Sequence, residues 1–105
     1  MIARLWHGWT ADGDADEYEQ RLLEEILPGI DRIDGYRGAY LLRRAVGGEV
    51  EFVTITLWDS LSAIHAFAGE DVERAVIAPS ARGLLSRYAE RSTHYETVAE
   101  PPARG

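Results

Sequence analysis

The chain has 105 residues, of which 46 % are hydrophobic, so we expect a single domain with one hydrophobic core. Eleven basic residues against 18 acidic ones give a net charge of −7, and all the basic residues are Arg, which makes nucleic acid and anionic membranes poor partners. The absence of Cys excludes disulfides, thiolate metal sites and cysteine nucleophiles. No signal peptide or apolar run of about 20 residues is evident, so we expect a cytoplasmic protein.

The N-terminal half predicts a strand, a helix and a hairpin. Residues 2–10 mix Ile, Leu and Trp before an Asp/Gly-rich turn, which is typical of a strand. An Asp and a Glu three residues apart begin a helix over residues 14–27, and Pro28-Gly29 is expected to end it. Residues 36–45 and 49–58 are predicted to be strands joined by a short glycine-containing turn.

The C-terminal half predicts helices followed by a strand. Ser60 is a suitable N-cap for a helix over residues 61–68, which a glycine ends. We expect a second helical piece at 72–77 and a third at 81–88. A last strand over residues 91–98 completes the order β-α-β-β-α-β.

This order predicts a ferredoxin-like α+β fold. In that fold a four-stranded antiparallel sheet has the spatial order 4-1-3-2 and carries its helices on one face. Residues 1–99 are expected to form the domain, and residues 100–105, with two prolines, a loose tail. Both sides of the strands carry apolar and aromatic residues, but the helices are able to cover only one face of the sheet. The other face would expose its apolar side chains to water, so we expect a homodimer that covers it.

The sequence resembles the antibiotic biosynthesis monooxygenase family, whose members are small dimeric α+β barrels. The resemblance covers roughly residues 2–98. It rests on five segments: Trp6-His7-Gly8-Trp9-Thr10, Pro28-Gly29, residues 52–60 (FVTITLWDS), residues 63–71 (AIHAFAGED) and His94-Tyr95-Glu96.

The resemblance implies one of two activities. One branch of the family oxidises phenolic polycyclic compounds with O2 and no cofactor, and the other binds haem and opens its ring. The haem branch uses an Asn in the first strand, a Trp in the second helix and a His that follows an Ala. Here Phe67 and Val76 stand at the last two positions and the sequence has no Asn, so haem cleavage is the less expected activity.

Histidines are the candidate bases. His94 is the first candidate and His7 the alternative, because both lie on strands that neighbour each other in the predicted order. Each is also compatible with a purely structural role. His65 is expected to face solvent, and the three histidines have no spacing typical of a metal site.

Aromatic residues and one arginine are the candidate substrate contacts. Trp58 is the strongest of them, because it belongs to the segment most similar to the family and its indole N–H is a potential donor to a substrate oxygen. The full set is Trp58, Trp6, Trp9, Tyr40, Tyr95, Phe67 and Arg44. Each of these residues is also a candidate for simple packing.

We therefore expect a homodimeric monooxygenase without cofactor or metal, which oxidises a small aromatic or polyketide-like phenol. Triplet O2 reacts slowly with closed-shell molecules, so the substrate itself must donate electrons, and a phenolate is able to do so. A histidine would remove the proton and an apolar cavity would exclude water. The alternatives are a non-catalytic dimer that binds a small hydrophobic ligand, and a non-oxidative isomerase or cyclase.

Overall fold

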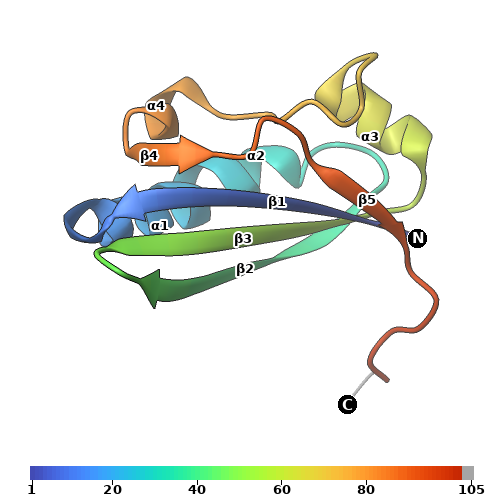
Figure 1. The fold of residues 1–105 in the computed structure, drawn as a ribbon. Helices are drawn as coiled ribbons and strands as arrows, with labels where there is room; N and C mark the ends of the chain where they lie inside the picture. The colour runs from blue at the N-terminus through green and yellow to red at the C-terminus, as the bar shows by residue number, and fades with distance from the viewer. Residues whose placement is uncertain (103–105) are drawn as a thin grey trace.

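The computed structural model describes residues 1–102, so the last three residues of the expected tail lie outside the described residues. Helices cover one face of a five-stranded antiparallel sheet (Figure 1). Its strands are β1 (Ile2–Ala11), β2 (Tyr36–Val46), β3 (Glu49–Trp58), β4 (Leu85–Tyr88) and β5 (Thr93–Glu96). The order is β2-β3-β1-β4, with β5 also paired to β1. This confirms the expected α+β fold and strand order, and adds one short strand.

Alternation along the strands divides the sheet into two faces. We call the side that carries the helices the helix face and the other side the open face. On β1, Arg4 and Trp6 belong to the helix face, whereas His7 and Trp9 belong to the open face. The register of β1 against β3 then places Phe52 opposite Gly8 on the helix face.

The first helical region is continuous through three elements: α1 (Ala15–Arg21), the π-helix η2 (Leu22–Ile26) and α2 (Leu27–Ile30). A short 3-10 turn, η1 (Asp12–Asp14), precedes them. The expectation that Pro28-Gly29 ends the helix is wrong, since α2 includes both residues. Just before Pro28, the N–H of Leu27 donates to the carbonyl of Leu22, which is a π-helical bond and not an α-helical one. The α-helical bonding pattern is therefore already interrupted at the point where Pro28 has no N–H to donate.

The expected helix at 81–88 is largely a strand. Only α4 (Pro79–Arg82) is helical there, and β4 follows it. β5 pairs with β1 from Ile2 to Leu5, which leaves the rest of that edge of β1 without a partner. β4 fills this gap by pairing with Gly8, Trp9 and Thr10, so edge pairing overrides the helical pattern.

The expected helix at 72–77 is absent, and residues 69–78 form an irregular connection between α3 (Leu61–Ala68) and α4. Its backbone groups bond elsewhere: Ala75 N donates to Glu90 O (2.9 Å) and Glu73 O accepts from Ser92 N (2.6 Å). These long-range bonds replace the local bonds that a helix would make. We call residues 69–78 the connecting segment.

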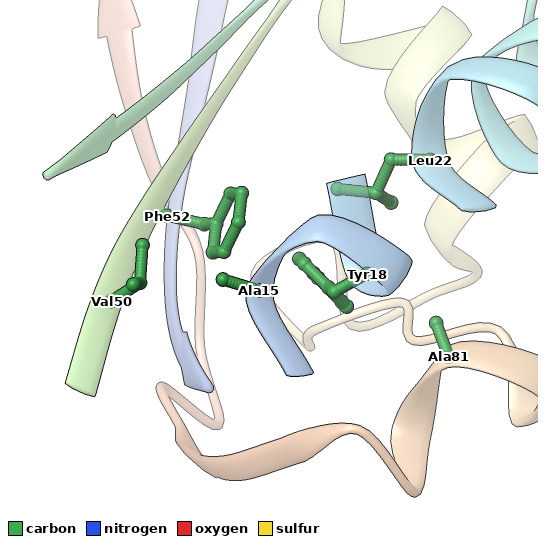
Figure 2. Packing of buried hydrophobic residues seen from close by; sticks show 6 residues of the cluster. All are labelled: Ala15, Tyr18, Leu22, Val50, Phe52 and Ala81. Carbon is green, nitrogen blue, oxygen red and sulfur yellow. The ribbon is translucent and has the colours of Figure 1, made fainter. Parts of the chain in front are cut away.

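The core lies between the helix face and α1. Tyr18 and Phe52 pack edge to face with ring centroids 4.8 Å apart, and Figure 2 shows them with the four other buried residues of the cluster, Ala15, Leu22, Val50 and Ala81. This packing fixes α1 across the strands. Among residues 1–102, no helix is long and apolar enough to cross a membrane.

Candidate functional site

A pocket lies between the helix face of the sheet and the helices. Its cavity measures about 70 Å³. Trp6 from β1, Phe67 from α3 and Tyr18 from α1 supply aromatic walls, and Val76 and Ile77 of the connecting segment supply part of the apolar remainder. The pocket is therefore a small, mainly apolar cavity with aromatic walls.

Trp6 is held in the pocket wall by two features of the chain. Its indole Nε1 donates to the carbonyl oxygen of Ala89 at 2.7 Å. Its six-membered ring lies over Gly8, where an added Cβ would come within 2.6 Å of the ring. The absence of a side chain at Gly8 thus creates the space that the indole occupies.

Arg4 is the one charged residue among those that line the pocket within residues 1–102. It is 4 % exposed, and its guanidinium lies 5.7 Å from the centroid of the Phe67 ring. Its nitrogens donate to the carbonyl of Val72 and, at 2.7 Å, to that of Arg74. Arg4 therefore joins the central strand to the connecting segment.

His94 lies beside Arg4. Arg4 Nη1 is 2.8 Å from His94 Nε2, and because a guanidinium only donates, this imidazole nitrogen accepts and carries no proton. Burial, and secondarily the charge of Arg4, lowers the pKa of His94. His94 is therefore neutral and is placed behind Arg4, outside the residues that line the pocket.

The remaining polar groups of the pocket are hydroxyls. Thr54 and Thr56 from β3 and Ser92 from the chain before β5 reach it, as does Tyr18. Burial raises the pKa of the Tyr18 hydroxyl, so this group stays protonated at neutral pH. These hydroxyls are able to donate to or accept from a ligand without adding charge.

Trp58 supports the pocket without lining it. It is fully buried and stacks on Phe67 with ring centroids 5.2 Å apart. Its indole N–H, expected as a donor to substrate, donates to Thr56 Oγ1 at 2.8 Å. Trp58 therefore positions Phe67 and Thr56, which reach the cavity themselves.

Five of the expected site residues lie on the open face, away from the pocket: His7, Trp9, Tyr40, Arg44 and Tyr95. His7 Nδ1 is 3.1 Å from Glu51 Oε2, and Arg44 Nε donates to Glu51 Oε1 at 2.6 Å. Both hydrogen bonds lower the pKa of Glu51, and the bond from Arg44 has the larger effect. The open face thus carries a hydrogen-bonded charged cluster, separated from the pocket by the sheet.

The family follows from comparison with known proteins. A family model described as antibiotic biosynthesis monooxygenase matches residues 1–78. The chain belongs to this family. A comparison with curated protein sequences finds no match.

Several solved structures share the fold of this chain. A crystal structure described as an antibiotic biosynthesis monooxygenase of Bacillus cereus has a TM-score of 0.68 at 16 % identity, covering 100 % of this chain and 98 % of that one. The haem-degrading protein MhuD of Mycobacterium tuberculosis has a TM-score of 0.67 at 20 % identity, covering 97 % of this chain and 100 % of that one. SnoaB, a cofactor-independent oxygenase of Streptomyces nogalater, has a TM-score of 0.66 at 16 % identity, covering 97 % of this chain and 98 % of that one.

Within this monooxygenase-family chain, the residue that the sequence predictions missed is Arg4. Its signal was present, because Arg4 and Trp6 share one side of β1, and an arginine in a strand otherwise rich in apolar residues needs a partner. Tyr18 was expected only as part of the helix over residues 14–27. The contribution of the connecting segment to the pocket wall was not predicted, because a helix was expected at residues 72–77.

Proposed function

We propose that this protein is a cofactor-independent monooxygenase that oxidises a small phenol with O2 in the pocket beside Trp6. The observation that supports the proposal is the apolar, aromatic-walled cavity in a chain of the monooxygenase family. The fold that this chain shares with SnoaB, described as a cofactor-independent oxygenase, is consistent with it.

The reaction balances without an added reductant. A phenol and O2 give a quinone and water: one oxygen atom becomes the new carbonyl, the other leaves as water, and the substrate supplies all four electrons. The protein's part is to favour the phenolate, which gives up an electron more readily than the phenol, and to exclude water.

His94 is the proposed acceptor of the phenol proton, with His7 as the alternative. Protonation of His94 at Nε2 requires that its hydrogen bond with Arg4 opens, which would leave an Arg4 N–H free for the phenolate. His7 lies on the open face, so a role for it would require a ligand on that side of the sheet. The two assignments are therefore separable by mutation.

The cavity limits the size of the substrate. At about 70 Å³ it is well below the ~300 Å³ at which pockets for drug-sized ligands begin. A small aromatic phenol is therefore favoured over a polyketide-like one, which would have to displace the connecting segment. The same limit, together with Val76 and Phe67 at the two family positions, favours phenol oxidation over haem cleavage.

Oxygen uptake tests the proposal. The purified protein, with a panel of one- and two-ring dihydroxy-aromatic compounds, is expected to consume O2 without flavin, metal or nicotinamide. His94→Ala should lower the rate by about 10²- to 10⁴-fold, as is usual for loss of a general base. His65→Ala is the matched control, because His65 is exposed on α3. Equal rates in the His94 variant and the wild type, with a large loss in His7→Ala, would move the base to the open face.

A second candidate is a binding protein without turnover. Two observations favour it: both strand histidines lie outside the pocket lining, and the Nε2 of His94 already accepts a hydrogen bond from Arg4. Ligand binding with no oxygen uptake and no change of ligand mass would support this function. A product of unchanged mass but altered structure would instead indicate a non-oxidative isomerase or cyclase.

We also propose that a second copy of the chain covers the open face. Helices shield only the other face (Figure 1), and the open face exposes large side chains such as Tyr40 (53 %) and Leu42 (49 %). A two-fold dimer would remove these surfaces from water.

A further inference from the structure

We propose that the pocket binds its aromatic ligand as an anion, and that the guanidinium of Arg4 is the cation that pairs with it. This inference rests on the proposed function in one respect, which is that the pocket is the ligand site. It names the charge state of the ligand, and it holds or fails whether or not the ligand is oxidised.

The first argument is the charge of the pocket. Arg4 is buried, and no Asp or Glu is found among the residues of 1–102 that line the cavity. A buried charge is costly unless an opposite charge or strong hydrogen bonds compensate it. The wall therefore carries a positive charge that no lining residue within 1–102 balances with a negative one.

The second argument is the nature of the groups that Arg4 bonds. They are the carbonyls of Val72 and Arg74 and the neutral Nε2 of His94. These three acceptors hold the guanidinium but bring no negative charge. Glu73 acts on Arg4 only through space, and its carboxylate lies at the half-exposed surface, 3.6 Å from Arg91.

The third argument is the number of donors. A guanidinium has five N–H groups, and the bonds within residues 1–102 use two on Nη1 and one on Nη2. The Nε–H and one N–H of Nη2 take no part in these bonds, and we assign them to a ligand oxygen. A planar pair of donors of this kind suits a phenolate or a carboxylate.

The consequence for the ligand is a shift in its acidity. An opposite charge within hydrogen-bond range lowers the pKa of an acid by about 1–3 units. A phenol in the pocket would therefore ionise more readily beside Arg4 than in water. As long as His94 is neutral, its Nε2 accepts from Arg4 and positions the guanidinium against the pocket wall; only the proposed oxidation requires His94 to accept a proton as well.

4-Nitrophenol tests the inference directly, because its phenolate absorbs visible light and its phenol form does not. In the wild type, the apparent pKa of the bound molecule should be lower than in solution, and it should bind about tenfold or more tightly than its neutral methyl ether, 4-nitroanisole. Binding of 4-nitrobenzoate is measured in parallel. If the protein binds it more tightly than 4-nitrophenol, the preferred anionic group is a carboxylate.

Arg4→Gln should abolish the shift in pKa and the preference for the anion while 4-nitroanisole still binds. If Arg4 serves only to hold the connecting segment, the variant should lose both ligands equally, and that result would overturn the inference. Arg4→Lys keeps the charge and should keep part of the preference. Arg37→Gln, which removes the same charge from an exposed ion pair with Asp59, is the matched control and should behave as the wild type.

The His94 variants test the positioning role. His94→Leu should reduce the preference for the anion, and His94→Gln should restore it, because an amide oxygen is able to accept from Arg4. Equal binding of 4-nitrophenol and 4-nitroanisole by the wild type, or binding of neither, would reject the proposal. Oxygen uptake measured on the same samples separates this outcome from failure of the proposed oxidation.

Discussion

Arg4, Trp6, His7 and Trp9 are neighbours on one strand, and alternation alone divides them between the two faces of the sheet. The sequence therefore predicts which of them lie together. It does not reveal which face the helices cover, because that depends on how α1 and α3 pack across the strands. For this reason Trp6 and Phe67, two of the residues predicted to contact a substrate, line the pocket, whereas Trp9 and Tyr40 lie on the open face.

Gly8→Ala is expected to destabilise the fold and to displace Trp6. The new Cβ would lie 2.6 Å from Trp6 Cη2 and 3.1 Å from Leu85 Cδ2, so the indole must move. Overpacking of this kind costs about 1–3 kcal/mol of unfolding free energy, which urea denaturation measures. Gly13→Ala, where no atom lies within 4 Å of the added Cβ, is the control and should leave stability nearly unchanged. Equal effects of the two substitutions would contradict the role assigned to Gly8.

His94 is expected to make stability dependent on pH. Burial and the neighbouring Arg4 lower its folded-state pKa, with Glu73 acting weakly in the opposite direction. The unfolded chain, whose histidine titrates near pH ~6.5, then binds the proton more readily than the folded chain.

The contribution of His94 should accordingly be complete above about pH 6.5 and be lost as the pH falls below that value through the folded-state pKa. Urea denaturation at a series of pH values, for the wild type and for His94→Gln, checks this. Glutamine accepts from Arg4 but does not titrate, so the free-energy difference between the two proteins should change below about pH 6.5. A constant difference would exclude a lowered pKa.

At the scale of elements, local signals predicted β1, the β2–β3 hairpin and α3. Gly47 and Gly48 both have positive φ, as the two central residues of a tight hairpin turn require. β4 was missed because its strand conformation depends on an unpaired edge of β1, about 75 residues away in the chain. The connecting segment was missed for a similar reason, since its partners are Arg4, Glu90 and Ser92.

Ser60→Ala should shorten or loosen the start of α3. The Ser60 hydroxyl accepts from the backbone N–H of Ala63 at 3.2 Å, and loss of an N-cap of this type costs about 1 kcal/mol. Because α3 carries Phe67 into the pocket, ligand affinity should fall as well. Ser62→Ala, inside the same helix and exposed, is the matched control, with unfolding followed by circular dichroism. A larger loss in the Ser62 variant would show that the cap does not matter.

For the whole molecule, the unequal covering of the two faces of the sheet is the dominant feature (Figure 1). Hydrophobic patterning predicted this arrangement, since both sides of the strands carry apolar residues while the helices are able to cover only one. The charged cluster of His7, Arg44 and Glu51 was not predicted, because its members come from three strands and meet only through the register.

Leu42→Glu is expected to convert the proposed dimer into a monomer, because it places a charge at an apolar position of the open face. Light scattering at micromolar concentration should give twice the chain mass for the wild type and the chain mass for the variant. Leu23→Glu is the matched control: Leu23 is 53 % exposed, like Leu42 at 49 %, but lies on the helical layer. A wild-type protein that is monomeric would reject the dimer outright.

The connecting segment is joined to the chain between β4 and β5 by hydrogen bonds from Ala75 N to Glu90 O and from Ser92 N to Glu73 O. Neither bond belongs to the ladders of the sheet, so both can break while the strands remain paired. The amide protons of Ala75 and Ser92 should therefore exchange with deuterated solvent through local opening, faster than those of the β1–β3 ladder, which wait for global unfolding. Opening of the pocket wall thus has its own exchange rate, and an occupied pocket would slow these two amides while leaving the ladder unaffected.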